Sequence, residues 1–116
     1  MDIEEVREYC IKKQEVTESF PFDDETLVFK VLGKMFCLSN LTHPISINLK
    51  CNSEEAIELR EEFDEIKPGF HMNKKHWNTV DLEGNLSKSF ILKMIDDSYK
   101  LVVSKLPKKE REKINL

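Results

Sequence analysis

The fold is decided by residues 26–39, whose sequence is TLVFKVLGKMFCLS. From Leu27, apolar residues recur at every second position, and this period is typical of a strand with one buried face. Leu32-Gly33 then predicts a tight turn, so a second strand should follow over Lys34–Ser39. The segment therefore predicts a β-hairpin.

The position of the turn also predicts the register of this hairpin. Phe29 should face Phe36, and Leu27 should face Leu38, because the turn is centred between them. These four residues would then share the core face of the sheet. The opposite face would carry Val28, Lys30, Met35 and Cys37.

The elements on either side of the hairpin are predicted from caps and periodicity. Two helices should begin at capping boxes, Asp2 with Glu5 and Asn52 with Glu55, and Ser87 should cap a third. Apolar residues alternate again at Ile45, Ile47 and Leu49, which predicts a further strand. The predicted elements, in order, are a helix over 3–13, strands over 26–31, 34–39 and 45–50, a helix after 52, strands over 70–72 and 77–82, and a helix over 88–105.

The order α-β-β-β-α-β-β-α predicts an α+β fold. Three helices with one apolar stripe each cannot cover both faces of a sheet, so we expect a two-layer sandwich with an antiparallel five-stranded sheet and helices on one face. A length of 116 residues fits a single domain over 1–116 that ends in a charged tail at 107–116. The uncovered face of the sheet should carry Lys30, Met35, Ser46, Asn48 and Lys50.

The charges of the chain are segregated along the sequence. The net charge is −4, from 18 basic and 22 acidic residues. Residues 51–66 hold seven acidic residues and one basic residue, whereas 30–50 and 67–80 hold three lysines each and no acidic residue. All three histidines also lie in these two acid-free segments. This pattern predicts cations on the uncovered sheet face and carboxylates on the helices.

Several classes of protein are disfavoured by the sequence. The longest stretch without a charged side chain, 35–49, is too polar to span a bilayer, and the acidic N-terminus is unlike a signal peptide. Cys10, Cys37 and Cys51 lack C-x-x-C spacing, which favours reduced thiols in a cytoplasmic protein. We find no motif for catalysis, for a cofactor or for a metal ion, so we expect a protein that is not an enzyme.

The segment 68–78, PGFHMNKKHWN, is the best candidate for a binding site. It combines lysines, histidines, asparagines and aromatic rings without a carboxylate, and this mixture suits a nucleic acid. Lysines would contact phosphates, while rings and amides would stack on bases or bond to them. In the alternative interpretation, Trp77 and Phe70 are core anchors and Lys74-Lys75 is a solvated loop.

Several segments together resemble the MmcQ/YjbR family of small bacterial proteins, and the resemblance extends over nearly the whole chain. They are Phe20–Phe22, 27–36 (LVFKVLGKMF), 47–51 (INLKC), 68–80 (PGFHMNKKHWNTV) and 98–103 (SYKLVV). The resemblance implies a two-layer α+β fold similar to that of secretion chaperones. It also implies DNA binding through a "double wing" arrangement of the strands.

The candidate binding residues come from two sources. The resemblance implies Lys34, Lys74, Lys75, His76, Trp77 and Asn78. The predicted sheet face adds Lys30 and Lys50, and the composition of segment 68–78 adds His71.

Two hypotheses follow for the function of the chain. Either it binds DNA or another nucleic acid, or it is a protein-interaction module that binds a second copy or a chaperone-like partner and has no nucleic-acid role. A continuous positive patch with an exposed Trp77 would favour the first hypothesis. An exposed apolar patch around Met35 and Val28 would favour the second.

Overall fold

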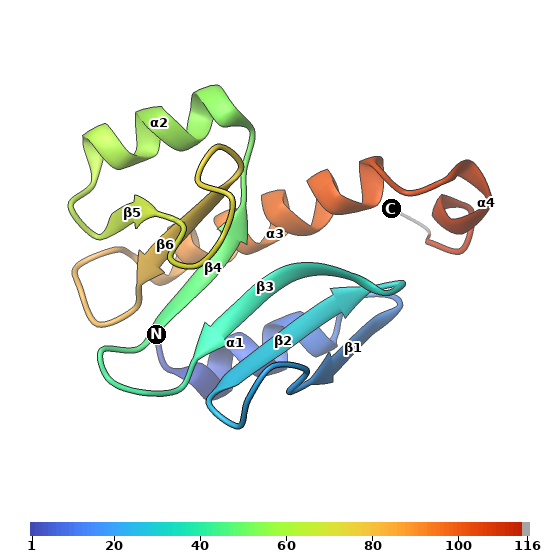
Figure 1. The fold of residues 1–116 in the computed structure, drawn as a ribbon, viewed down its shortest axis with the longest axis horizontal. Helices are drawn as coiled ribbons and strands as arrows, with labels where there is room; N and C mark the ends of the chain where they lie inside the picture. The colour runs from blue at the N-terminus through green and yellow to red at the C-terminus, as the bar shows by residue number, and fades with distance from the viewer. Residues whose placement is uncertain (115–116) are drawn as a thin grey trace.

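Six antiparallel strands form one twisted sheet in the computed structural model, which describes residues 1–114 (Figure 1). The strand order is β1-β2-β3-β4-β6-β5. The strands are β1 (Val16–Ser19), β2 (Thr26–Val31), β3 (Lys34–Asn40), β4 (Ser46–Lys50), β5 (Ile66–Pro68) and β6 (Trp77–Asp81). The helices are α1 (Ile3–Ile11), α2 (Ser53–Glu62), α3 (Lys88–Ser104) and α4 (Lys108–Arg111).

The helices begin where their caps predict. Asp2 and Glu5 form a capping box, Asn52 accepts from the N–H of Glu54, and Ser87 accepts from the N–H of Phe90. Helices α1 and α3 lie behind the sheet, and α2 lies near β5 and β6 (Figure 1). The α+β class with an antiparallel sheet is therefore confirmed.

The number of strands differs from the prediction, which gave five. Strand β1 was not predicted because its sequence, VTES, shows no apolar alternation, and only Val16 is partly buried. It is held instead by backbone pairing with β2 at the edge of the sheet. The strand predicted over 70–72 is also wrong, because β5 ends at Pro68 and a turn follows in which the Met72 N–H donates to the Gly69 carbonyl at 3.3 Å.

The hairpin of β2 and β3 forms, but its predicted register is wrong. Phe29 pairs with Cys37, and Lys30 pairs with Met35, so the pairing skips Phe36. This irregularity gives β3 one extra residue and turns both Phe36 and Cys37 into the main core. Leu38 consequently lies on the opposite face of the sheet, in a separate small cluster.

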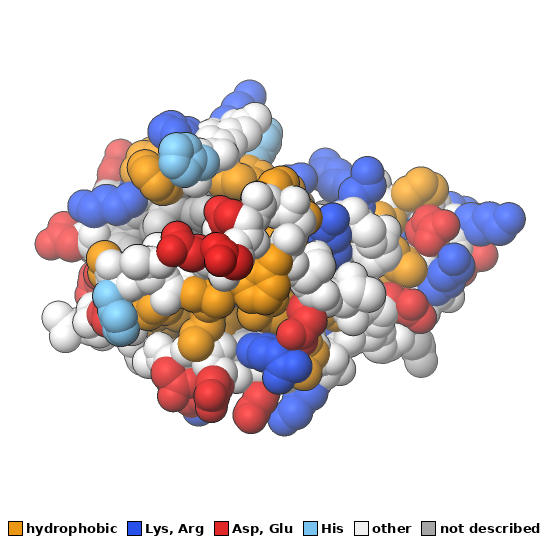
Figure 2. Space-filling view, turned by 60° about the horizontal axis from the view of Figure 1, so that its bottom comes forward, with side chains coloured by type: hydrophobic (Ala, Val, Ile, Leu, Met, Phe, Trp, Pro, Cys, Tyr) orange, Lys and Arg blue, Asp and Glu red, His pale blue; other side chains and the backbone are white. Residues whose placement is uncertain are grey.

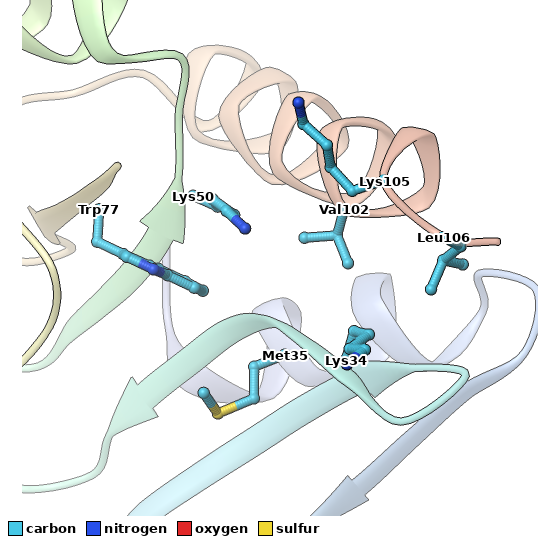
Figure 3. A pocket seen from close by; sticks show the side chains of 7 residues that line it. All are labelled: Lys34, Met35, Lys50, Trp77, Val102, Lys105 and Leu106. Carbon is cyan, nitrogen blue, oxygen red and sulfur yellow. The ribbon is translucent and has the colours of Figure 1, made fainter. Parts of the chain in front are cut away.

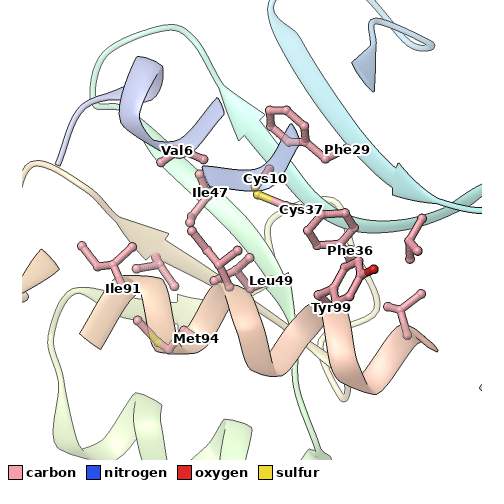
Figure 4. Packing of buried hydrophobic residues seen from close by; sticks show 14 of the residues in the cluster. Val6, Cys10, Phe29, Phe36, Cys37, Ile47, Leu49, Ile91, Met94 and Tyr99 are labelled. Atoms are coloured by element: carbon pink, nitrogen blue, oxygen red, sulfur yellow. The ribbon is translucent and has the colours of Figure 1, made fainter. Parts of the chain in front are cut away.

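The main core fills the space between the sheet and the helices (Figure 4). Val6 and Cys10 of α1 and Tyr99 of α3 meet strand residues such as Phe36 there, and the Phe36 and Tyr99 rings pack edge to face at 5.3 Å. The segment after Pro107, predicted as a charged tail, forms α4 and returns Ile114 to this core. Residues 115–116 of the predicted tail lie outside the described residues.

Helices α1 and α3 are joined by a polar cluster at the edge of the core. The Tyr9 hydroxyl donates to both carboxylate oxygens of Asp96 at 2.8 Å, and the Lys13 ammonium lies 2.5 Å from the same carboxylate. Partial burial and the Asp96 carboxylate raise the pKa of Tyr9 to about 12. The hydroxyl, the ammonium and the carboxylate satisfy one another's hydrogen-bonding capacity. We therefore assign the cluster a structural role, which is to hold α1 against α3.

The face of the sheet away from α1 and α3, here called the helix-free face, carries a second, smaller cluster. Val28, Leu38 and Trp77 are buried there, with Met35 and Met72 packed against them. The apolar patch that would have favoured a protein-interaction module is therefore not exposed, because Val28 has no accessible surface.

Candidate functional site

Strands β3 and β4 separate at one end of their pairing. The antiparallel pairing of the two strands begins where Asn40 pairs with Ser46 and ends where Cys37 pairs with Leu49. Beyond it, the Lys50 N–H donates to the hydroxyl of Ser98 on α3 at 2.9 Å, and that hydroxyl donates to the Phe36 carbonyl at 2.6 Å. The fully buried Ser98 thus bridges two backbones that would otherwise pair directly, and it holds the strands apart.

The separated strands open a hollow of about 360 Å³, here called the basic hollow (Figure 3). Val102 of α3 lies between the two strands, and Lys50 and Trp77 project into the space from β4 and β6. No carboxylate lines it. The lining residues are Lys34, Met35, Lys50, Trp77, Val102, Lys105 and Leu106.

The charge of the hollow comes from Lys34, Lys50 and Lys105, which none of the ion pairs among residues 1–114 includes. Lys105 caps the C-terminus of α3, where the helix dipole carries partial negative charge. The hollow is therefore a local concentration of positive charge in a chain with a net charge of −4.

Trp77 is a core anchor that borders the basic hollow. Its side chain is 8% exposed and packs with Val28 and Leu38. Gly69 permits this packing, because a Cβ there would lie 2.7 Å from the Trp77 Cβ. The exposed Trp77 that would have favoured nucleic-acid binding by stacking is thus not observed, although the ring still reaches the hollow (Figure 3).

Two further predicted site residues hold the structure together around β6. Asn78 is 3% exposed, and its amide accepts from Arg60 Nε at 2.6 Å and donates to the Ala56 carbonyl at 3.3 Å. The Lys74 ammonium donates to the Gly69 carbonyl at 3.1 Å, within its own loop. The buried amide of Asn78 is not accessible to a base, and Lys74 is directed toward its own backbone.

The remaining predicted residues lie outside the lining of the hollow. Lys30 is partly buried and pairs with Met35, one strand away from the hollow. Lys75 and His76 belong to the turn before β6, and Lys75 is exposed. His71 lies at a different site on the helix-free face. The structure therefore unites Lys34, Lys50 and Trp77 of the predicted set and separates the others.

A second depression, here called the aromatic groove, lies on the helix-free face toward the other end of β3 and β4. Its volume is about 390 Å³. Figure 2 shows a band of hydrophobic side chains across one face of the molecule, with carboxylates beside it. The groove is lined by Phe22, Asp23, Thr26, Leu38, Asn40, Ser46, Asn48, Phe70, His71, Met72 and Thr79.

The predicted separation of charge is only partly observed. Carboxylates do not lie on the helices alone, because Asp23 lines the aromatic groove. Asp81 on β6 lines a neighbouring depression together with Asp64 and Glu65. Of these depressions, only the basic hollow gathers lysines without a carboxylate, because Lys67 shares the neighbouring depression with acidic residues, and the prediction of a uniformly cationic face is wrong.

Four residues that shape these two sites were not predicted from the sequence. Lys105 and Ser98 come from the last helix, and only the folded chain brings them to β3 and β4. Phe22 and Asp23 lie in the loop before β2. The segment Phe20–Phe22 contributed to the family resemblance, and its two phenylalanines on either side of a proline, outside any apolar alternation, were the signal that could have identified this site.

The three cysteines are free thiols, and none of them is exposed. Partial burial, with Glu55 and Asp97 nearby, raises the pKa of Cys51 to about 11, so its thiol is protonated at neutral pH. Cys10 and Cys37 are buried. Over residues 1–114, no group of three histidine, cysteine or acidic side chains is placed to hold a metal ion. None of the helices in this range combines the length and apolarity needed to cross a bilayer.

Comparison with known proteins gives consistent results. The family model named YjbR matches residues 11–101. The chain is 33% identical over 113 residues to YjbR of Escherichia coli K12, covering 97% of this chain and 96% of that protein. It is 38% identical over 96 residues to YbdF of Escherichia coli O157:H7, covering 82% and 79% of the two chains. Both relatives are described as uncharacterised proteins.

Solved structures support the same relationship. The crystal structure of Deinococcus radiodurans protein DR2400, with a domain named DUF419, superposes with a TM-score of 0.89 at 40% identity. That match covers 95% of this chain and 85% of the other. A crystal structure of a Pseudomonas syringae protein gives a TM-score of 0.77 at 28% identity, covering 87% and 98% of the chains.

Proposed function

The chain belongs to the YjbR family, and on that premise we propose that it binds single-stranded nucleic acid through the phosphate groups. Lys34, Lys50 and Lys105 are the proposed contacts. The observation that carries the proposal is that these three lysines surround one hollow without a carboxylate in its lining. The relatives supply no role, so the proposal depends on this geometry.

The chemistry of the basic hollow suits a phosphate that is attached to an organic group. A lysine ammonium is a compact cation with three donors, and it binds a phosphate oxygen without needing a fixed orientation. Met35 and Val102 give the hollow an apolar wall against which a sugar can pack. A free phosphate would use only the cations, whereas a nucleotide would also contact this wall.

The shape of the site favours a single strand over a duplex. Proteins that read duplex DNA usually insert a helix or a two-stranded ribbon into the major groove. Here the lysines line a depression between strands, which a flexible strand can enter. Proteins that bind single strands combine a positively charged groove with aromatic rings, and their binding depends strongly on salt.

The proposal is tested by fluorescence anisotropy with a labelled 12-nucleotide DNA of mixed sequence. Three phosphate contacts on a single strand give a slope of log K against log salt of about −2. The triple substitution Lys34→Ala/Lys50→Ala/Lys105→Ala should bring this slope close to zero. It should also weaken binding by about 10- to 100-fold at low salt.

A matched control separates the hollow from the net charge. The triple substitution Lys12→Ala/Lys100→Ala/Lys109→Ala makes the same change in net charge at exposed positions outside the hollow. It should retain the slope and most of the affinity. The proposal is rejected if the wild-type protein does not bind the strand at low salt, or if both triple variants lose the same affinity.

A further inference from the structure

We propose that the aromatic groove holds a planar ring with amino hydrogens, namely an unpaired nucleobase, between Phe22 and Phe70. This inference rests on the proposed function, because the base would belong to the strand whose phosphates occupy the basic hollow. The aromatic groove would thus be a second site, in which the ring of the ligand is bound. It lies about two residues along β4 and β6 from the basic hollow.

The two phenylalanines come from loops on opposite sides of the groove. Phe22 precedes β2 and Phe70 precedes β6, and the sheet order places β3 and β4 between those strands. Both side chains are largely exposed, Phe22 by 64% and Phe70 by 68%. Large apolar side chains that remain this exposed beside a depression often mark a binding site. Stacking on such rings is how proteins hold unpaired bases.

The backbones that carry these rings are fixed, although the rings are exposed. The Phe70 N–H donates to Thr79 Oγ1 at 2.9 Å, and its carbonyl accepts from Asn48 Nδ2 at 3.4 Å. The Phe70 ring also packs against His71 with 4.1 Å between ring centroids. On the other side, the Asp23 carboxylate accepts from the N–H groups of Glu25 and Thr26. A ligand would therefore meet walls that are already in place.

The floor of the groove offers hydrogen bonds to the edge of a ring. Leu38 supplies an apolar surface, and Ser46 presents a hydroxyl beside it, whereas the amides of Asn40 and Asn48 are already hydrogen-bonded within the protein. The Ser46 hydroxyl makes no hydrogen bond within residues 1–114 and is available to a ligand. A protein side chain such as phenylalanine would leave this hydroxyl unused, whereas a ring nitrogen or an exocyclic group of a base would form a hydrogen bond with it.

Asp23 selects the chemical class of the ring. Hydrogen bonds from backbone N–H groups hold the pKa of its carboxyl below the ordinary value, so the group is an anion at neutral pH. Both backbone N–H groups donate to Oδ1, and Oδ2 has only a 3.4 Å contact with the Thr26 hydroxyl. An anionic oxygen accepts from an amino group such as N4 of cytosine and repels the carbonyl oxygens of thymine.

The two sites lie on the same strands, which fits one continuous ligand. Asn48 in the aromatic groove is followed on β4 by Lys50 in the basic hollow, and Thr79 on β6 is preceded by Trp77. Residues two apart on a strand face the same side and are about 6–7 Å apart. A base in the groove can therefore belong to a nucleotide next to the phosphates in the hollow.

The test compares three labelled strands of equal length: oligo(dC), oligo(dT) and an abasic deoxyribose phosphate. The wild-type protein should bind oligo(dC) about ten-fold more tightly than the abasic strand, because stacking of a base is lost in the abasic strand. Phe22→Ala/Phe70→Ala should remove this difference and leave binding of the abasic strand unchanged. Asp23→Asn keeps an oxygen that can accept from the N–H groups of Glu25 and Thr26, but it removes the negative charge. It should therefore reduce the ratio of the affinities for oligo(dC) and oligo(dT).

Competition with cytidine monophosphate identifies the source of the ring. Displacement near the strand's own dissociation constant would indicate a free nucleotide as the occupant, and displacement only at much higher concentrations would indicate the strand. Both results support the groove as a base site. The inference is overturned if abasic and base-bearing strands bind equally, or if the double phenylalanine variant behaves as wild type.

Binding of the abasic strand reports on the basic hollow alone, and the preference for base-bearing strands reports on the aromatic groove. If the abasic strand binds and the triple lysine variant loses that binding, the phosphates occupy the hollow whatever the groove does. If a protein segment occupies the groove instead, the double phenylalanine variant will leave all three strands unaffected, which rejects the base site alone.

Discussion

The two ends of the helix-free face are built on the same strands and differ in chemistry. At one end β3 and β4 have separated, and Lys34, Lys50 and Lys105 surround an apolar wall. At the other end the strands are fully paired and form a polar floor between two phenylalanine rings, with Asp23 beside them. One end suits an anion, and the other suits a planar ring with amino hydrogens.

This difference shows how local strand pairing sets the chemistry of a sheet surface. Where the ladder is closed, side chains stand about 5 Å apart and form a shallow floor. Where Ser98 is inserted between the Lys50 N–H and the Phe36 carbonyl, the sheet opens and Val102 of α3 becomes part of the surface. A single buried hydroxyl therefore links the two strands at the point where the basic hollow opens.

The largest effect is expected for Ser98→Ala, which removes the hydroxyl that bridges β3 and β4 beside the basic hollow. The change leaves the partly buried Lys50 N–H and the buried Phe36 carbonyl without their shared partner, and each unsatisfied buried group costs about 1–3 kcal/mol. We expect a loss of about 2–4 kcal/mol in the free energy of unfolding, measured by urea denaturation.

The control for this prediction is Ser104→Ala on the same helix. Ser104 is exposed, and its hydroxyl donates only to the Leu101 carbonyl within α3. Its loss should change the unfolding free energy by less than about 0.5 kcal/mol. Equal stability of Ser98→Ala and the wild type would show that the hydroxyl does not hold the strands apart.

A smaller effect is expected for Gly69→Ala, which perturbs both ends at once. The new Cβ would lie 2.7 Å from the Trp77 Cβ, so the loop or β6 must shift. Overpacking of this kind costs about 1–3 kcal/mol, and calorimetry should show a lower Tm. Because Gly69 lies between β5 and Phe70, the shift should also reduce the preference for oligo(dC).

Gly69→Ala can also affect binding at one end of the face and not at the other. Suppose that Gly69→Ala weakens binding of the abasic strand and leaves the preference for oligo(dC) intact. The new Cβ would then have displaced Trp77 without displacing Phe70. A variant with wild-type Tm and wild-type binding at both ends would contradict the tight packing at this position.

The fold was largely predictable from local signals. The caps at Asp2, Asn52 and Ser87 mark the starts of three helices, because short polar side chains satisfy the first N–H groups of a helix. Positive φ angles at Leu32 and Gly33 confirm the predicted hairpin turn. These features depend on neighbouring residues only.

The features that were not predicted depend on distant residues. The irregularity at Phe36 changes the register of β3, and nothing in the local alternation marks it. Strand β1 has no apolar pattern because it is held by backbone pairing at the sheet edge. Lys34, Lys50 and Trp77 were predicted site residues, but Lys105 joins them only through the packing of α3 on β3 and β4.

Trp77 allows binding at the basic hollow to be tested without a label, because it is the single tryptophan of the chain and it lines the hollow. Unlabelled 12-nucleotide DNA should change the Trp77 emission with the same midpoint as the anisotropy titration. The triple lysine variant should show no such change at the same concentrations. Saturable binding of the strand with an unchanged Trp77 spectrum would contradict the account, since the strand would then bind away from the hollow.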